Sequence, residues 1–294
     1  MPEISEFQPG LPSWADLSTP DADESASFYE ALFGWEAKDA PGDPEENGGY
    51  RLFLKDGKQV SGLMKIQQEG QPPSWSTYIS VSDADEIAEK VKEAGGDVMV
   101  EPMDVMDLGR MAFFADPTGA AFGVWQAKEH KGSEVVSEPG APAWHQVNTR
   151  DPDKAGEFYK AVFSWDSERL DTGGADYWEW QLDGKSVGGM FRMGDDFPDD
   201  VPAHWIVYFA VEDADAATEK AKESGAQVRA EPFDTEAGRI AVLTDPHGAA
   251  FAVINQGGGS VAGEEGGDGD EAGQEKNDGE NGEQEEDQDD AEER

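Results

Sequence analysis

The sequence contains no cysteine, few basic side chains and no long apolar run. The absence of cysteine excludes disulfides, thiolate nucleophiles and thiolate metal ligands. Only 22 lysine and arginine residues stand against 65 aspartate and glutamate residues, so the formal net charge is −43. Because such a chain is repelled by phosphate and by anionic lipid, we expect neither a nucleic-acid partner nor a membrane partner.

The N-terminus carries no recognisable targeting signal. Met-Pro-Glu-Ile-Ser-Glu has neither the basic segment nor the apolar segment of a secretory signal peptide. No stretch approaches the roughly 20 apolar residues that a membrane-spanning helix needs. The sequence therefore predicts a cytoplasmic protein.

What is present is a long repeat. The segment from Trp14 to Trp35 returns as Trp144 to Trp165, with matching residues 130 positions apart, and the offset becomes 129 at Asp116 and Asp245. Each copy has about 120 residues, the usual size of a domain with its own core. The predicted organisation is domain 1 at residues 10–127, a polar linker at 128–139, domain 2 at 140–256 and a tail at 257–294.

The tail differs from the repeats in composition. Residues 257–294 contain 16 acidic and two basic residues and almost no large apolar side chains. Such a segment cannot bury enough apolar surface to offset the entropy of ordering it, which predicts disorder. A solubilising role is favoured over a partner-binding motif.

The first half of each repeat predicts a strand followed by a helix. Residues 13–18 alternate in polarity, as a half-buried strand does. Asp21 precedes an apolar helical stripe and fits an N-cap, and Gly34 fits the helix end. In the second repeat Asp151 takes the cap position and Pro152 the first helical position, where its missing N–H costs nothing.

The remainder of each repeat predicts hairpins around a second helix. Asp56-Gly57 and Asp183-Gly184 are dipeptides typical of two-residue hairpin turns. The later elements predicted in the first repeat are a strand at 75–81, a helix at 83–94, a short strand at 98–100 and hairpin strands at 110–115 and 121–126. Asp-Pro-Thr-Gly joins the last two strands with the residues that a type I turn prefers.

This order of motifs resembles the vicinal oxygen chelate superfamily, which includes glyoxalase I, bleomycin resistance proteins and extradiol dioxygenases. The resemblance rests on Phe-Tyr before Leu-Phe-Gly-Trp, the Asp-Gly-Lys hairpins and the closing Asp-Pro-x-Gly turn, and it covers both domains. It implies an α+β fold of tandem glyoxalase-like domains. Each domain would contain two βαβββ modules that form a cup-shaped mixed sheet with the helices outside.

The resemblance also implies where a metal centre would lie. The ligand positions of the family's metal enzymes fall on Trp14, Ser76 and Gly123 in the first repeat and on Trp144, Ile206 and Ala252 in the second. None of these is a usual ligand for a catalytic divalent ion. A shift of one residue brings His145 onto the first strand, but it also turns the side chain to the opposite face of the sheet. We therefore expect no metal and no cofactor.

The four histidines favour structural or surface roles. His130 lies in the linker and His247 in a turn, and both are expected to be solvated. His145 and His204 begin strands of the second repeat, and their counterparts in the first repeat are Ala15 and Ser74. Histidine chemistry shared by both repeats is therefore excluded.

Alternation along the strands predicts the residues that line the cups. The candidate ligand-binding residues are Trp14, Asp16, Tyr78, Trp125, Trp144, Gln146, Asn148 and Tyr208. Aromatic side chains with a few polar groups suit a small aromatic or amphipathic molecule. The same side chains also suit an ordinary core that fills each cup, and the pattern does not separate these two interpretations.

Asp16 is the only carboxylate among these candidates and a weak candidate for a catalytic base. A lone acid among aromatic residues can have a raised pKa or bind a cationic ligand, although such acids are more often satisfied by a backbone N–H or an arginine. Arg110 and Arg239 could receive an anionic group, but ion pairing is favoured in so acidic a chain.

Three functions remain open. The favoured one is a metal-free protein, monomeric or homodimeric, that binds a small aromatic or amphipathic molecule. The second is a metal-dependent lyase, isomerase or dioxygenase, and the third is a structural module without a ligand. The fold alone does not choose among them.

Overall fold

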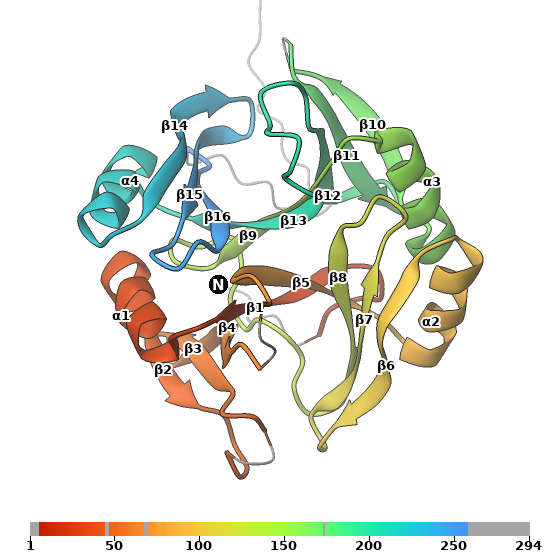
Figure 1. Cartoon of the computed structure of the whole chain (residues 1–294), viewed down its shortest axis with the longest axis horizontal. Helices are drawn as coiled ribbons and strands as arrows, with labels where there is room; N and C mark the ends of the chain where they lie inside the picture. Colours follow the sequence, from red (N-terminus) through yellow and green to blue (C-terminus); the bar gives the residue numbers. More distant parts are fainter. Residues whose placement is uncertain (1–5, 45–46, 68–69, 173, 258–294) are drawn as a thin grey trace, which may run out of the picture. The chain divides into compact units, whose positions relative to one another are not determined.

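Each repeat forms one eight-stranded mixed sheet (Figure 1). The computed structural model describes residues 6–44, 47–67, 70–172 and 174–257. The first repeat contains β1 (Pro12–Thr19), α1 (Ala22–Phe33), β2 (Glu36–Asp39), β3 (Arg51–Lys55), β4 (Lys58–Lys65), β5 (Ser74–Ser80), α2 (Ala84–Glu93), β6 (Asp97–Val105), β7 (Gly109–Ala115) and β8 (Ala121–Ala127). The second contains β9 (Pro142–Thr149), α3 (Pro152–Phe163), β10 (Asp166–Asp171), β11 (Asp176–Leu182), β12 (Lys185–Arg192), β13 (His204–Ala210), α4 (Ala214–Glu223), β14 (Gln227–Thr235), β15 (Gly238–Thr244) and β16 (Ala250–Asn255).

The two βαβββ modules of a repeat join at the middle of its sheet. The strand order is β2-β3-β4-β1-β5-β8-β7-β6 in the first sheet and β10-β11-β12-β9-β13-β16-β15-β14 in the second. β1 runs antiparallel to β5, while β1 is parallel to β4 and β5 is parallel to β8. Modules therefore pair within a repeat, and the α+β architecture implied by the resemblance is confirmed.

The helix boundaries confirm the predicted caps. The Asp21 carboxylate accepts hydrogen bonds from the backbone N–H groups of Asp23 and Glu24, and α1 ends at Gly34 with φ of 74°. Asp151 caps α3 with Pro152 in its first turn. Side-chain oxygens at these caps satisfy N–H groups that have no partner within the helix.

The strand predicted at 98–100 is longer than expected. β6 runs from Asp97 to Val105, and its register against β7 shifts twice. Because these bulges break the alternation of side chains, the polarity pattern of the sequence predicted only a short strand. β6 lies at the edge of the sheet and is bulged between Val100 and Met103, and both features make a proline such as Pro102 tolerable in a strand.

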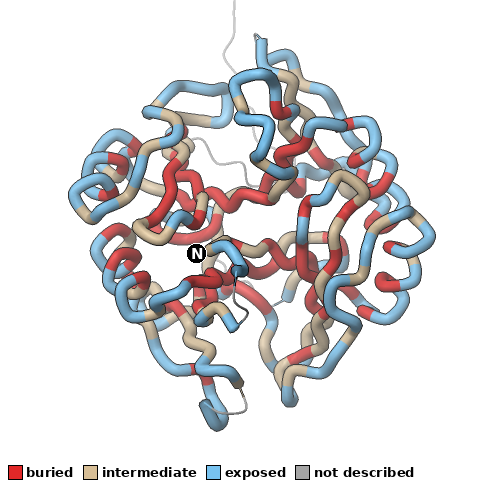
Figure 2. The backbone as a smooth tube through the Cα atoms, in the orientation of Figure 1, coloured by how far each residue is buried: buried red, intermediate tan, exposed pale blue. Residues whose placement is uncertain are grey.

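Two hydrophobic cores lie on the convex faces of the sheets, and each takes side chains from both repeats. The buried stretches of the backbone lie mostly on the strands toward the middle of the molecule (Figure 2). One core joins α2, β7 and β8 with α3 and the first strands of the second sheet; it includes Phe114, Phe122, Phe158, Tyr159, Trp165 and Trp180. The other joins α1 and the first strands of the first sheet with β13, β15 and β16; it includes Phe28, Tyr29, Trp35, Trp75, Phe209 and Phe251. Each repeat therefore buries its convex face against the other repeat.

Two reciprocal hydrogen-bond relays join the repeats. Trp75 Nε1 donates to the Tyr29 hydroxyl at 2.8 Å, and this hydroxyl donates to Asp245 Oδ2 at 3.2 Å. Trp205 Nε1 donates to the Tyr159 hydroxyl at 2.9 Å, which donates to Asp116 Oδ2 at 3.0 Å. The tyrosine of each Phe-Tyr pair therefore binds the aspartate that begins the other repeat's Asp-Pro turn.

Tyr159→Phe is expected to destabilise the fold. The substitution leaves Asp116 Oδ2 and Trp205 Nε1 without their partner in a buried site, at a cost of about 1–3 kcal/mol. Urea unfolding of the single variant, of Asp116→Asn and of the double variant measures the coupling between the two side chains. Strictly additive effects would contradict the relay.

Candidate functional site

The concave face of the first sheet, named cup 1, is floored by aromatic side chains. Trp14, Tyr78 and Trp125 pack together there, each less than a tenth exposed. Glycines make room for the rings: a Cβ on Gly123 would lie 2.4 Å from Tyr78 Cδ1, and one on Gly109 would lie 2.3 Å from Trp125 Cζ2. The floor of cup 1 is therefore filled by its own side chains, so a ligand would lie above it.

Asp16 lies beside this floor and is 3% exposed. Its Oδ2 accepts hydrogen bonds from the Tyr78 hydroxyl at 2.9 Å and the Tyr50 hydroxyl at 3.2 Å. The Tyr50 hydroxyl in turn accepts from Trp14 Nε1 at 2.9 Å. Gly62 pairs with Asp16 between β4 and β1, and a Cβ there would lie 1.8 Å from the Tyr50 hydroxyl. The absence of a side chain at Gly62 is thus what admits Tyr50 to the carboxylate.

The Asp16 carboxylate has no cationic partner in the part of the chain that the structure describes. No ion pair among the described residues includes it. Burial raises the pKa of Asp16 from 3.8 to about 6, although hydrogen bonds from Tyr78, Tyr50 and Ser76 act to lower it. Burial, followed by the charge of Asp16, raises the pKa of Tyr50 and of Tyr78 well above 10, so both hydroxyls remain protonated donors.

The rim of cup 1 is apolar and partly exposed. Val100 pairs with Phe113 and Met103 with Met111 between β6 and β7, so these side chains share the concave face. Met103 is 49% exposed and the neighbouring Met106 is 41% exposed. Methionine side chains adapt readily to irregular apolar surfaces. This rim is therefore suited to contact an apolar molecule above Asp16.

The expectation that His130 and His247 are solvated was wrong, because both side chains are largely buried. The His130 ring lies 4.5 Å from Trp14 and 5.6 Å from Trp125, and burial lowers its pKa to about 4. The linker folds back on the sheet, where Ser133 N donates to Ser13 O at 2.9 Å. The His247 side chain is 15% exposed, with Nε2 3.4 Å from Glu24 Oε2.

The concave face of the second sheet, named cup 2, carries an amide network in place of the acid. Tyr208 donates to Gln146 Oε1 at 3.0 Å, and Gln146 Nε2 donates to Asn148 Oδ1 at 2.6 Å. Asn148 Nδ2 lies 3.0 Å from His204 Nε2. Trp144 Nε1 donates to the Tyr177 hydroxyl at 2.9 Å, as Trp14 does to Tyr50 in cup 1.

Sequence reasoning missed Tyr50 and Tyr177. Each tyrosine stands six positions before the aspartate of an Asp-Gly turn, Asp56 or Asp183. Comparing the two repeats around these turns would have shown the pair. Their inward direction depends on the strand twist and on the neighbouring glycines, which alternation does not reveal.

His145 and the two arginines Arg110 and Arg239 lie outside the cups. His145 points to the opposite face, where Nδ1 lies 2.9 Å from Thr77 Oγ1 and burial lowers the pKa to about 3. Arg110 donates to both carboxylate oxygens of Asp85 at 2.8 and 2.9 Å, and Arg239 pairs with Asp215 and Asp234. These arginines therefore form surface ion pairs.

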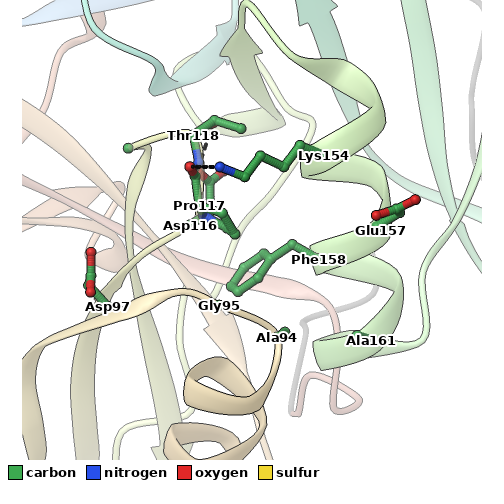
Figure 3. Close-up of a pocket in the computed structure, with 11 residues that line it drawn as sticks. Ala94, Gly95, Asp97, Asp116, Pro117, Thr118, Lys154, Glu157, Phe158 and Ala161 are labelled. Atoms are coloured by element: carbon green, nitrogen blue, oxygen red, sulfur yellow. Dashed lines mark hydrogen bonds between the residues drawn. The ribbon is translucent and has the colours of Figure 1, made fainter.

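A recess of about 630 Å³ lies outside both cups, between the end of α2 and α3 (Figure 3). Two of its polar groups are already engaged: Lys154 Nζ donates to Pro117 O at 2.8 Å, and Asp116 Oδ1 accepts from Thr118 N at 2.7 Å. Phe158 closes one side. Lys154 and Asp116 are therefore committed to bonds within the protein.

Tandem cups, each built from two βαβββ modules, define the class of protein to which this chain belongs. The model of the Glyoxalase/Bleomycin resistance protein/Dioxygenase superfamily matches residues 12–124, and the model of a Glyoxalase-like domain matches residues 144–254. The chain is a member of this superfamily, as the resemblance predicted.

Relatives match most of the chain. CFP32 of Mycobacterium tuberculosis (strain CDC 1551 / Oshkosh), provisionally named a glyoxylase, is 43% identical over 259 residues, covering 86% of this chain and 98% of that protein. DauV of Streptomyces sp. (strain C5), named as an anthracycline biosynthesis protein, is 40% identical over 265 residues, covering 85% and 95%.

Solved structures share the fold at low identity. The 2,3-dioxygenase LapB from Pseudomonas sp. KL28 superposes with a TM-score of 0.60 at 14% identity, covering 85% of this chain and 93% of that chain. The Mn(II)-bound glyoxalase from Novosphingobium aromaticivorans gives 0.59 at 14% identity, covering 85% and 83%. At this identity the likeness shows the fold alone.

The side chains of the cups do not fit a metal centre of the family's kind. In cup 1 the three expected positions hold Trp14, Ser76 and Gly123, and the carboxylate of Asp16 lies beside Ser76. Within residues 6–44, 47–67, 70–172 and 174–257, no three His, Asp or Glu side chains gather as a metal site.

Among the described residues, no helix is long and apolar enough to cross a membrane.

Proposed function

We propose that cup 1 binds a small aromatic or amphipathic molecule without a resident metal, and that Asp16 accepts a hydrogen bond or a positive charge from this ligand. The observation that carries the proposal is the buried Asp16 carboxylate, which accepts two tyrosine hydrogen bonds and has no cationic partner among the described residues. Proteins rarely keep such a group where a neutral one fits, and the second repeat has Gln146 at this position. A ligand that supplies a positive charge or a further hydrogen bond would explain why the acid is present.

The surroundings of Asp16 indicate which ligand would fit. The Tyr50 and Tyr78 hydroxyls contact the carboxylate, and Trp14 contacts Tyr50, so the side chains around the acid are aromatic, which favours a cation or a flat ring. The rim of Met103, Met106 and Met111 provides apolar contact. A protonated amine or a phenolic hydroxyl on an aromatic frame therefore fits best, and an aromatic carboxylate is repelled. The relative named for anthracycline biosynthesis is consistent with a small-molecule role.

A panel built on one aromatic frame tests this function. Isothermal titration is expected to show that 2-naphthylmethylammonium and 2-naphthol bind and that 2-naphthoate does not. Asp16→Asn is expected to weaken the ammonium ligand at least about tenfold, because a charge-assisted hydrogen bond contributes about 1.5–3 kcal/mol. Glu93→Gln removes the same charge from an exposed position on α2 and serves as the control.

Two outcomes would overturn the proposal. Equal affinity for naphthoate and naphthylmethylammonium would show that Asp16 does not select the ligand. Tight, stoichiometric retention of nickel, zinc, manganese or iron by the purified chain would refute the metal-free part and favour a metal-dependent lyase, isomerase or dioxygenase. If no member of the panel bound, the structural interpretation would be favoured.

A second candidate function is proton transfer by Asp16. A carboxyl group with a pKa of about 6 is partly ionised near neutral pH, and a general base works best when its pKa lies near the operating pH. Under this alternative Asp16→Asn would abolish turnover of a bound phenol or ketone while Tyr78→Phe retained part of it. If the ligands bound but none was turned over, proton transfer by Asp16 would be refuted and ligand binding would remain as the function.

A further inference from the structure

We infer that cup 2 is a second ligand site with the opposite hydrogen-bond polarity, which takes an uncharged aromatic molecule that presents an acceptor oxygen, such as a ketone. This inference rests on the proposed function only in treating the concave faces as binding faces. The observation that carries it is the direction of the hydrogen bonds along the amide network.

The network can be oriented from one end. His204 Nδ1 lies 2.9 Å from the Pro202 carbonyl oxygen, which can only accept, so Nδ1 carries the proton. His204 Nε2 is then the acceptor for Asn148 Nδ2 at 3.0 Å, which leaves Asn148 Oδ1 to accept from Gln146 Nε2 at 2.6 Å. Gln146 Oε1 finally accepts from the Tyr208 hydroxyl at 3.0 Å. Each of these side-chain acceptors is therefore engaged, and Gln146 retains a second N–H.

Tyr177 adds another spare donor. Its hydroxyl accepts from Trp144 Nε1 at 2.9 Å, and no described residue accepts its own proton. In cup 1 the matching proton goes from Tyr50 to Asp16. Tyr177 lies over Gly189, the strand partner of Gln146, so the two spare donors lie beside each other. Cup 2 thus offers donors where cup 1 offers an acceptor.

The charge nearby excludes an anionic ligand. Glu179 pairs with Gly189 on the side away from Gln146, and its carboxylate accepts from Ser186 and from Gln181. Burial, and to a smaller extent the charge of Glu179, raises the pKa of Tyr177 to about 12 against a lowering by Trp144. Tyr177 therefore stays a donor, while Glu179 repels a carboxylate or phosphate ligand. An uncharged acceptor such as a ketone remains.

Cup 2 also has smaller walls than cup 1. Ile254 stands where cup 1 has Trp125, Val242 where it has Phe113, and Ala237 where it has Leu108. In cup 1 the indole ring of Trp125 lies against Gly109, whereas in cup 2 the smaller Ile254 takes the place of this ring. Trp144 and Tyr177 are partly exposed, and Phe233 at the rim is 45% exposed. There is therefore room for a flat molecule to lie over Ile206, Ile240 and Ile254 and to reach the Tyr177 hydroxyl.

The test uses 2-acetylnaphthalene, which has the same aromatic frame with a ketone oxygen. We expect it to bind, and Tyr177→Phe to weaken it about five- to tenfold by removing one donor. Gln146→Glu should weaken the ketone similarly and improve binding of 2-naphthylmethylammonium, because it gives cup 2 an acid like that of cup 1. Thermal unfolding of each variant verifies that it folds.

The results separate this inference from the function proposed for cup 1. An unchanged affinity of Tyr177→Phe for 2-acetylnaphthalene, or no binding of this ketone by the unmodified chain, would overturn the inference. Failure of 2-naphthylmethylammonium to bind, or its insensitivity to Asp16→Asn, would overturn the function proposed for cup 1 instead. Loss of ketone binding in Asp16→Asn but not in Tyr177→Phe would place the ketone in cup 1 and contradict the inference.

Discussion

A chain shortened to residues 6–139 is expected not to fold as a monomer. The convex face of its sheet carries large apolar side chains that the second repeat covers in the complete chain: Phe28 and Tyr29 pack against Phe251, and Phe122 packs against Phe158 and Tyr159. Exposing a fully buried aromatic side chain costs about 1.5–3 kcal/mol, and several such losses exceed the total stability of a typical domain. Circular dichroism and sedimentation are expected to show an unfolded or self-associated species.

The matched experiment provides the second repeat as a separate chain. Co-expression of residues 6–139 with residues 140–257 is expected to restore a folded complex, because both shared cores and both Trp–Tyr–Asp relays can form between separate chains. A dimer of one half with itself is compatible with this expectation, since each half carries one member of every reciprocal contact. A monomeric half with cooperative urea unfolding would contradict it.

The parts of the fold that follow from local chemistry were predictable. Asp21 and Asp151 read as helix caps because a carboxylate satisfies free N–H groups wherever it precedes a helix. The concave positions of Trp14 and Tyr78 followed from alternation, because β1 and β5 are regular strands paired antiparallel along most of their length. Where a strand contains bulges, as β6 does, the same reasoning failed.

What depends on distant partners could not be predicted. The apolar residue Phe28 fits a helix face whether its own repeat or the other repeat covers it, so the shared cores leave no local pattern. His130 is polar and lies in a linker, and only the return of that linker across β1 buries it against Trp14. The pairing of Tyr50 with Asp16 likewise depends on Gly62, 46 positions from Asp16. The predicted tail beyond Gly257 lies outside the described residues.

Asp16→Asn is expected to stabilise the ligand-free chain near neutral pH. Since the pKa of Asp16 rises from 3.8 to about 6 on folding, the folded state favours the protonated acid. The stability due to this group is therefore fully present below pH 3.8 and is lost as the pH rises through 6. At pH 7.5 the ionised carboxylate costs about 3 kcal/mol, at 1.36 kcal/mol for each pKa unit. Asparagine avoids this cost and can still accept hydrogen bonds from Tyr78 and Tyr50.

Urea unfolding at two pH values measures this effect. The unfolding free energy of Asp16→Asn should exceed that of the unmodified chain by about 3 kcal/mol at pH 7.5 and by almost nothing at pH 3.5. Glu93→Gln, which removes an exposed carboxylate from α2, controls for the change in net charge. An equal difference at both pH values, or a loss of stability at pH 7.5, would show that Asp16 is satisfied as an ordinary structural group. The expected result instead means that cup 1 keeps an acid at the expense of stability, as a site selected for binding or for proton transfer does.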